Sequence, residues 1–283
     1  MSSVIERALS GLKEKELKMI WEISKDGKIS FMVGTAHFFP SSFRRSITEY
    51  IGKVDTVLIE GPLDEDAMDK VAKAGRRNEM DQSLRSFIDH ETEGKLIAEL
   101  TAPFRCRSTF FRYYGHVMEN EARNSLDETF NELKPWLAFF SIWYQYLRMR
   151  GWTYSMDKDA YNVARELNKH VHYLEEIDEQ INALEHIPVE RMVNFLSNIA
   201  NWKEYMKRYV KIYLKGDLEK LMDNAEVFPT RCEAVIENRD IILYERMTPY
   251  MAEGRCLACV GITHIMGIQS MLRKDGWSIK QLQ

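Results

Sequence analysis

Apolar positions form short strand-like runs near both ends of the chain, whereas they recur with helical spacing through most of the middle. Residues 17–34 contain two β-leaning runs on either side of Asp26-Gly27. Asp-Gly between such runs predicts a tight hairpin, because glycine accepts the positive φ of the turn. A compact buried strand is predicted at residues 54–60, where the run VDTVLIE stops at Gly61-Pro62.

The segment between these strands reads as a helix. It spans residues 41–53, and Ser41 or Ser42 is placed to cap its first turn. A strand, a helical crossover and a second strand at this spacing are typical of a parallel pair. The N-terminal part of the chain therefore predicts a sheet that contains parallel strands.

The rest of the chain predicts helices interrupted by few strands. Helices are expected at residues 63–87, 119–150, 157–168, 189–222, 232–253 and up to Lys274, and strands at 170–175, 256–260 and 277–282. We therefore expect a mixed α/β fold, in which the N- and C-terminal segments build a central mixed β-sheet. Residues 1–283 are expected to form one domain with a mainly helical insertion at about residues 63–225.

Composition and charge narrow the function classes. The 283 residues are 45% hydrophobic, which is typical of a globular protein. The net charge of −4 gives no electrostatic reason to expect nucleic acid as a partner. Four cysteines are too few for a disulfide framework and indicate a reducing compartment. No apolar stretch is long enough to span a bilayer, and the charged N-terminus lacks the apolar core of a secretory signal. We expect a cytoplasmic protein.

Two copies of a Gly-x-x-His motif supply candidate functional residues. Gly34-Thr35-Ala36-His37 and Gly261-Ile262-Thr263-His264 each follow a predicted strand, and Glu60 closes another. Ligands of open α/β sheets bind at the carboxyl ends of the strands, so these side chains are expected to meet at one edge. Two imidazoles and a carboxylate are sufficient to hold a divalent metal ion and leave positions open for water.

Two other patterns are weaker candidates for metal sites. Cys256 and Cys259 form a Cys-x-x-Cys pattern, but within a strand their side chains point to opposite faces, which favours a core strand. His170 and His172 would share one strand face, and a polar strand edge is the stronger interpretation in the absence of a third ligand.

The order of motifs resembles that of TraB/GumN (TIKI-like) proteins. The resemblance runs from about Trp21 to Ile279. Its matching segments are WEISKDGKISFMVGTAH, VDTVLIEGP, Lys134-Pro135-Trp136, Met156-Asp157, Leu174-Glu175 with Gln180, Glu237-Asn238-Arg239-Asp240 and Cys259-Val260-Gly261-Ile262-Thr263-His264. It implies a mixed α/β fold related to the erythromycin-esterase and ChaN-like proteins. TIKI members are divalent-metal-dependent proteases, and TraB-type members shut down peptide pheromones. Unlike TIKI proteins, this sequence shows no export signal.

The resemblance also implies roles for single residues. His37, Glu60 and His264 match positions considered functional in the family. We assign His37 and His264 as metal ligands, with Mn, Co or Zn as the expected ion, and Glu60 as either the third ligand or the general base on the metal-bound water. Arg239 matches a functional position, where it would neutralise an oxyanion or hold a substrate carboxylate, and Glu175 is a weaker match. Without the resemblance, a salt bridge from Arg239 to Asp240 or Glu237 on its own helix is the simpler interpretation.

Three functions remain open at this point. The first is a metal-dependent hydrolase of peptides or amides. The second is an esterase-like hydrolase in which a histidine acts as the base on water, and the third is a protein that binds or sequesters peptides without cleaving them. All three imply a peptide or small-molecule partner, and the sequence predicts no oligomeric state.

Overall fold

A mixed six-stranded β-sheet lies at the centre of the computed structural model, which describes residues 14–102 and 109–282. The strand order is β4-β3-β5-β2-β1-β6. The strands are β1 (Ile20–Lys25), β2 (Lys28–Thr35), β3 (Thr56–Ile59), β4 (His170–Tyr173), β5 (Cys256–Gly261) and β6 (Ser278–Gln281). Strands β4, β3, β5 and β2 run parallel, and β1 pairs antiparallel with β2 and β6. The mixed α/β class and the mixed sheet built from both ends of the chain are thereby confirmed.

The predicted hairpin at Asp26-Gly27 is confirmed. Lys25 pairs with Lys28, so Asp26 and Gly27 alone make the turn. Asp26 has φ 51° and Gly27 has φ 75°, and two successive positive φ values are typical of the type I′ turn whose twist matches that of the flanking strands. The hairpin fixes the register of β2 and thus the point at which the first Gly-x-x-His motif leaves the sheet.

The predicted pairing of β2 with β3 is wrong. Both strands run parallel as expected, but the C-terminal strand β5 lies between them and pairs with each. All five residues from Cys256 to Val260 are buried, as the centre of a sheet covered on both faces requires. The sequence distance between β3 and β5 hides this insertion from local pattern analysis.

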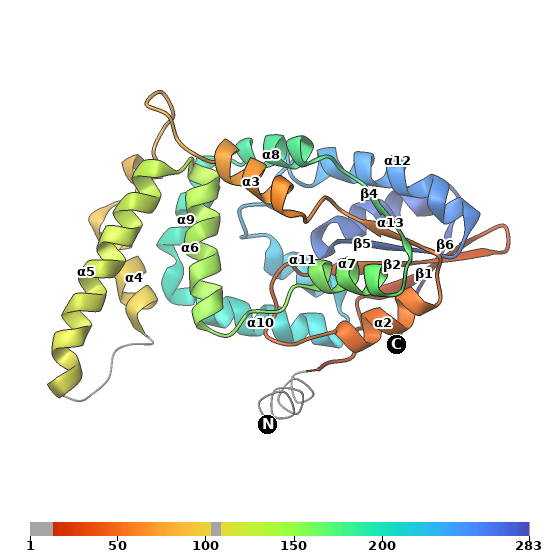
Figure 1. The fold of residues 1–283 in the computed structure, drawn as a ribbon, viewed down its shortest axis with the longest axis horizontal. Coiled ribbons are helices and arrows are strands. Elements are labelled where there is room, and N and C mark those ends of the chain that lie inside the picture. Colours follow the sequence, from red (N-terminus) through yellow and green to blue (C-terminus); the bar gives the residue numbers. More distant parts are fainter. Residues whose placement is uncertain (1–13, 103–108, 283) are drawn as a thin grey trace.

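Helices cover the sheet and also form a separate group beside it, and together they fill most of the middle of the chain (Figure 1). They are α2 (Arg44–Gly52), α3 (Glu65–Ala74), α4 (His90–Thr101), α5 (Thr109–Glu132), α6 (Pro135–Met149), α7 (Met156–Glu166), α8 (Ile177–Glu185), α9 (Val189–Ser197), α10 (Trp202–Lys215), α11 (Leu218–Ala225), α12 (Glu237–Glu253) and α13 (Ile265–Lys274). Short 3-10 turns occur at η1 (Leu84–Phe87), η3 (Ile199–Asn201) and η4 (Ile262–His264).

Several helix boundaries differ from the sequence-based prediction. The expected helix at residues 63–87 consists of α3 and the short turn η1 with irregular chain between them. The expected helix at 119–150 breaks before Pro135, because proline lacks the N–H that a continuing helix needs. At the start of α2 the N-cap is Phe43, and Ser42 instead accepts a hydrogen bond from the Arg44 N–H at 3.1 Å.

Two large hydrophobic clusters stabilise the described structure. One surrounds the sheet, where α12 packs on β2 and β5 while α7 packs on β3, β4 and β5 from the other side (Figure 1). The other lies among the helices of the middle region and contains Trp136, Phe139, Trp143 and Trp202. The aromatic run of α6 is therefore helix core. The division of the chain into one domain with an insertion stays a prediction.

Candidate functional site

Three parallel strands deliver the two motifs and Glu60 to one edge of the sheet. Thr35 of β2 pairs with Gly261 of β5, and Ile59 of β3 pairs with Cys259 of β5. Glu60 directly follows β3, while His37 and His264 lie shortly beyond the ends of β2 and β5. The prediction that these residues share the carboxyl edge of the sheet is therefore confirmed.

His264 is buried and its ring is held by a carboxylate. Its Nδ1 donates to Oδ1 of Asp240, on α12, at 2.7 Å. Burial raises the pKa of Asp240, and the hydrogen bond and charge of His264 oppose that rise. Helix α13 approaches closely at this point, because a Cβ on Gly267 would lie 1.8 Å from Oδ2 of Asp240. Glycine at this position thus makes room for the histidine–aspartate pair.

His37 forms a second pair of the same kind. Its Nδ1 donates to Oδ2 of Asp157, near the start of α7, at 2.8 Å. Asp157 is 4% exposed, whereas the His37 side chain is 65% exposed. The charge of Asp157 is the main reason why the pKa of His37 rises to about 9. His37 thus presents an oriented and accessible ring at the edge of the sheet.

Neither aspartate was predicted as a histidine partner. Asp157 is 120 residues from His37, and Asp240 is 24 residues from His264. Both lie in segments that carry the family resemblance, which is the one signal in the sequence that marks them. Their role as partners depends on the packing of α7 and α12 against the sheet.

A buried arginine joins two buried carboxylates beside the histidines. Arg239 Nη2 donates to Oε1 of Glu60 at 2.5 Å and to Oε2 of Glu175 at 2.6 Å, and its Nε donates to Oε1 of Glu175 at 2.8 Å. Glu175 is 1% exposed and also accepts a hydrogen bond from Gln180. The alternative of a salt bridge from Arg239 to Asp240 or Glu237 is wrong, because Arg239 points from α12 toward the ends of β3 and β4.

Glu60 is held as a carboxylate. Burial alone would raise its pKa, but the charges of Arg239, His264 and His37 outweigh burial and hold the pKa of Glu60 well below its usual range. The backbone N–H of Gly261 donates to its Oε2 at 2.7 Å. The charge of Glu60 raises the pKa of Arg239, so the two groups stay ionised together.

The two imidazoles have the orientation that metal-ligating histidines share. A carboxylate holds each Nδ1, which leaves Nε2 to face a ligand, and metal-ligating histidines commonly donate their other ring N–H to a carboxylate in this way. The Thr35 hydroxyl, at the end of β2, is buried and lacks a hydrogen-bond partner among the described residues. The donor types therefore fit a metal ion. Within residues 14–102 and 109–282, however, no three His, Cys, Asp or Glu side chains are grouped closely enough to hold one.

The weaker metal candidates lie elsewhere. Cys256 and Cys259 are buried free thiols in the central strand β5, as the core-strand interpretation predicts. His170 and His172 are exposed on the edge strand β4, where His170 lies at the beginning of the strand rather than at its carboxyl end. His172 packs against the ring of Tyr250, with the centroids 4.7 Å apart.

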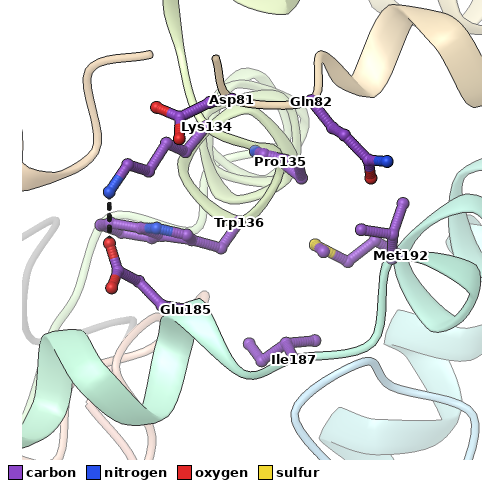
Figure 2. Close-up of a pocket in the computed structure, with 9 residues that line it drawn as sticks. Asp81, Gln82, Lys134, Pro135, Trp136, Glu185, Ile187 and Met192 are labelled. Atoms are coloured by element: carbon purple, nitrogen blue, oxygen red, sulfur yellow. Dashed lines mark hydrogen bonds and ion pairs between the residues drawn. The ribbon is translucent and has the colours of Figure 1, made fainter. Parts of the chain in front are cut away.

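A separate pocket of about 270 Å³ opens among the helices (Figure 2). It is lined by Asp81, Gln82, Lys134, Pro135, Trp136, Glu185, Ile187, Val189 and Met192. An ion pair between Lys134 and Glu185 lies beside the Trp136 ring (Figure 2). None of the residues at the sheet edge lines this pocket, so the Lys134-Pro135-Trp136 segment contributes to a different part of the molecule.

Comparison with known proteins agrees with the motif order. The model of the TraB/PrgY/gumN family matches residues 19–281, nearly the whole chain. A search of the curated proteins found no match. In the described part of the chain, no helix has both the length and the apolar character needed to cross a membrane. The prediction of no secretory signal concerns residues 1–13, which lie outside the described residues. The chain belongs to the TraB/PrgY/gumN family.

Proposed function

We propose that this chain is a hydrolase that cleaves peptides or related amides with the help of a divalent metal ion, Mn, Co or Zn. The observation that carries the proposal is the pair of histidine–aspartate contacts, His37 with Asp157 and His264 with Asp240, at the sheet edge that also carries Glu60. Membership of the family supports the scaffold, and the chemistry rests on these residues.

His37 and His264 would hold the metal through Nε2. Asp157 and Asp240 keep the Nδ1 protons in place and orient the two rings. When bound, the ion would polarise a scissile carbonyl and lower the pKa of a bound water. The pKa of His37 is raised, so a proton must leave this ring before its Nε2 can act as a ligand.

Glu60 is better suited to supply fixed negative charge than to accept a proton. Both of its oxygens already accept hydrogen bonds, from Arg239 and from the Gly261 N–H, and its low pKa makes it a weak base. We therefore assign Glu60 the role of a fixed negative charge near the metal-binding histidines. Arg239 positions Glu60, and Glu175 anchors Arg239 through two hydrogen bonds.

A metal-independent hydrolase is the second candidate, favoured by one observation. His37 is exposed and bound to a buried aspartate, which is the arrangement of a histidine that transfers protons to and from water. In that mechanism His37 is the base, and its activity rises with pH toward the raised pKa. A protein that only binds peptides would use the same edge without turnover.

Metal content tests the proposal. Protein purified without chelator is analysed by mass spectrometry for Mn, Co and Zn, together with His37→Ala, His264→Ala and the control His172→Ala on the exposed edge strand. We expect about one ion per chain in wild type and in His172→Ala, and loss of the ion in the other two variants. Metal-free wild type that hydrolyses peptides would support the second candidate instead.

A further inference from the structure

Arg231 lies beside the second Gly-x-x-His motif with much of its hydrogen-bonding capacity unused. It belongs to the irregular segment between α11 and α12, and its Nη1 donates to the carbonyl oxygen of Thr263, next to His264, at 3.4 Å. Its side chain is 20% exposed. Glu226 forms its ion pair with Arg231 at a long distance, 3.8 Å from Oε2 to Nε. Nε is itself buried and has no hydrogen-bond partner among the described residues, so the exposed part of the side chain is the Nη end of the guanidinium.

The segment that carries Arg231 is held firmly from the neighbouring helices. Arg191 of α9 donates to the carbonyl oxygens of Glu226, Phe228 and Pro229 at 2.7, 3.1 and 3.3 Å. The ring of Phe228 packs against four aromatic rings, those of Phe139, Trp143, Phe195 and Tyr205. Since the backbone is fixed in this way, little ordering is needed before the Arg231 guanidinium can bind a ligand.

The other arginine at the site is already occupied. Arg239 donates to both Glu60 and Glu175 and is buried between them. Arg231 therefore differs from Arg239 in having an exposed part and only a long contact to an exposed carboxylate. A guanidinium binds a planar carboxylate with two parallel hydrogen bonds, which gives orientation as well as affinity.

The fixed charges on the His264 side favour a cation there for an acidic ligand. Arg239 pairs with Glu60 and Glu175, and His37 pairs with Asp157, but the Asp240 carboxylate is paired only with the His264 ring among the described residues, so a substrate carboxylate would be repelled on this side without a cation nearby. Arg231 is close enough for its charge to act on Asp240, so it can offset this repulsion on the His264 side.

We propose that Arg231 binds a carboxylate of the substrate, supplied by a free C-terminus or by an Asp or Glu side chain, on the His264 side of the site. This inference rests on the proposed function, since it assumes that peptides bind at this edge. It assigns to Arg231 the recognition of a substrate carboxylate, which the sequence-based prediction gave as one of two alternative roles of Arg239. The substrate class is then peptides with an acidic group close to the bond that is cleaved.

The test uses randomised, N-acetylated hexapeptides in three forms with the full-length protein. The first form has a free C-terminus and no Asp or Glu, the second is amidated and contains Asp and Glu, and the third is amidated without them. Binding is measured by equilibrium dialysis and cleavage by mass spectrometry. The variants are Arg231→Gln, Arg231→Lys, Glu226→Gln and, as a control, Arg273→Gln, which removes an exposed arginine of α13 that bonds Gln269.

We expect wild type to bind at least one carboxylate-bearing form more tightly than the third form, and the preferred form identifies the source of the carboxylate. Arg231→Gln should reduce this preference about 10- to 100-fold, Arg231→Lys should restore part of it, and the other two variants should keep it. Equal binding of all forms by wild type, binding of none, or an unchanged preference in Arg231→Gln would overturn the inference. Carboxylate-dependent binding without cleavage would contradict the proposed hydrolase but not the role of Arg231.

Discussion

Oε2 of Glu60 accepts a hydrogen bond from the backbone N–H of Gly261 at 2.7 Å. The two residues are 201 positions apart, yet this contact ties the end of β3 to the first residue of the second Gly-x-x-His motif. The other oxygen of Glu60 is held by Arg239. The carboxylate of Glu60 is therefore fixed where the N-terminal and C-terminal parts of the chain meet to form the site.

Loss of Arg239 should destabilise the fold. Arg239→Gln leaves Glu60 and Glu175 buried without their cation, and breaking a buried ion pair typically costs about 3–5 kcal/mol in the free energy of unfolding. The matched control is Arg246→Gln on the same helix, where the half-exposed pair with Glu179 should contribute about 0–1 kcal/mol. Urea unfolding of both variants measures the difference. Equal losses in the free energy of unfolding would show that the buried ion pairs of Arg239 stabilise the fold no more than the half-exposed pair of Arg246.

Asp157 and Asp240 should determine the affinity for metal but not the fold. Asp157→Asn and Asp240→Asn remove the charge that holds each Nδ1 proton, and loss of such a partner typically lowers metal affinity about 10- to 100-fold. Isothermal titration with Mn, Co and Zn measures the change. Asp159→Asn, on the same helix as Asp157 but paired with Arg44, should bind metal like wild type. If it is equally impaired, the loss does not come from the histidine partners.

Acid should weaken the contribution of Glu60 to stability. The pKa of Glu60 lies below its ordinary value of 4.5 in the folded state, so folding favours the carboxylate. This stabilisation is complete above pH 4.5 and is lost as the pH falls from 4.5 toward the lowered pKa. The difference in the free energy of unfolding between wild type and Glu60→Gln should therefore shrink in acid, and a difference that grows as the pH falls would contradict the assignment.

The pKa of His37 should depend on Asp157. It is raised from 6.5 to about 9, so the stabilisation from this pair is complete below pH 6.5 and is lost as the pH rises through about 9. In metal-free protein, an NMR titration of the His37 ring should give a pKa above 6.5 that falls toward 6.5 in Asp157→Asn. An unchanged pKa in the variant would mean that another group holds the proton.

The sequence predicts those parts of the site that depend on local pattern. Asp26-Gly27 marks the hairpin, and the glycines that begin each Gly-x-x-His motif mark where β2 and β5 end. Because parallel strands end at one edge of the sheet, the shared edge of His37, Glu60 and His264 follows from these strand ends. Their expected grouping within reach of one metal ion is not seen among the described residues.

The remaining parts depend on contacts between distant segments. Strand β5 enters between β2 and β3 from the far end of the chain, and no local spacing predicts that order. Asp157 and Asp240 become histidine partners only when α7 and α12 pack on the sheet. Arg239 is predicted as a functional residue, but its partners Glu60 and Glu175 are fixed by the folded strands β3 and β4 rather than by its own helix.

Peptide hydrolysis after removal and return of metal tests the central claim most directly. The substrates are the randomised, N-acetylated hexapeptides. Hydrolysis is measured before and after addition of Mn, Co or Zn, for chelator-treated wild type, His37→Ala, His264→Ala and the control His172→Ala. We expect wild type and His172→Ala to lose activity with the metal and regain it when one of the ions returns, while the other two variants stay inactive or recover only in part at high metal concentration. Full hydrolysis by chelator-treated wild type, or full recovery of His37→Ala and His264→Ala, would contradict a metal-dependent site at this edge of the sheet.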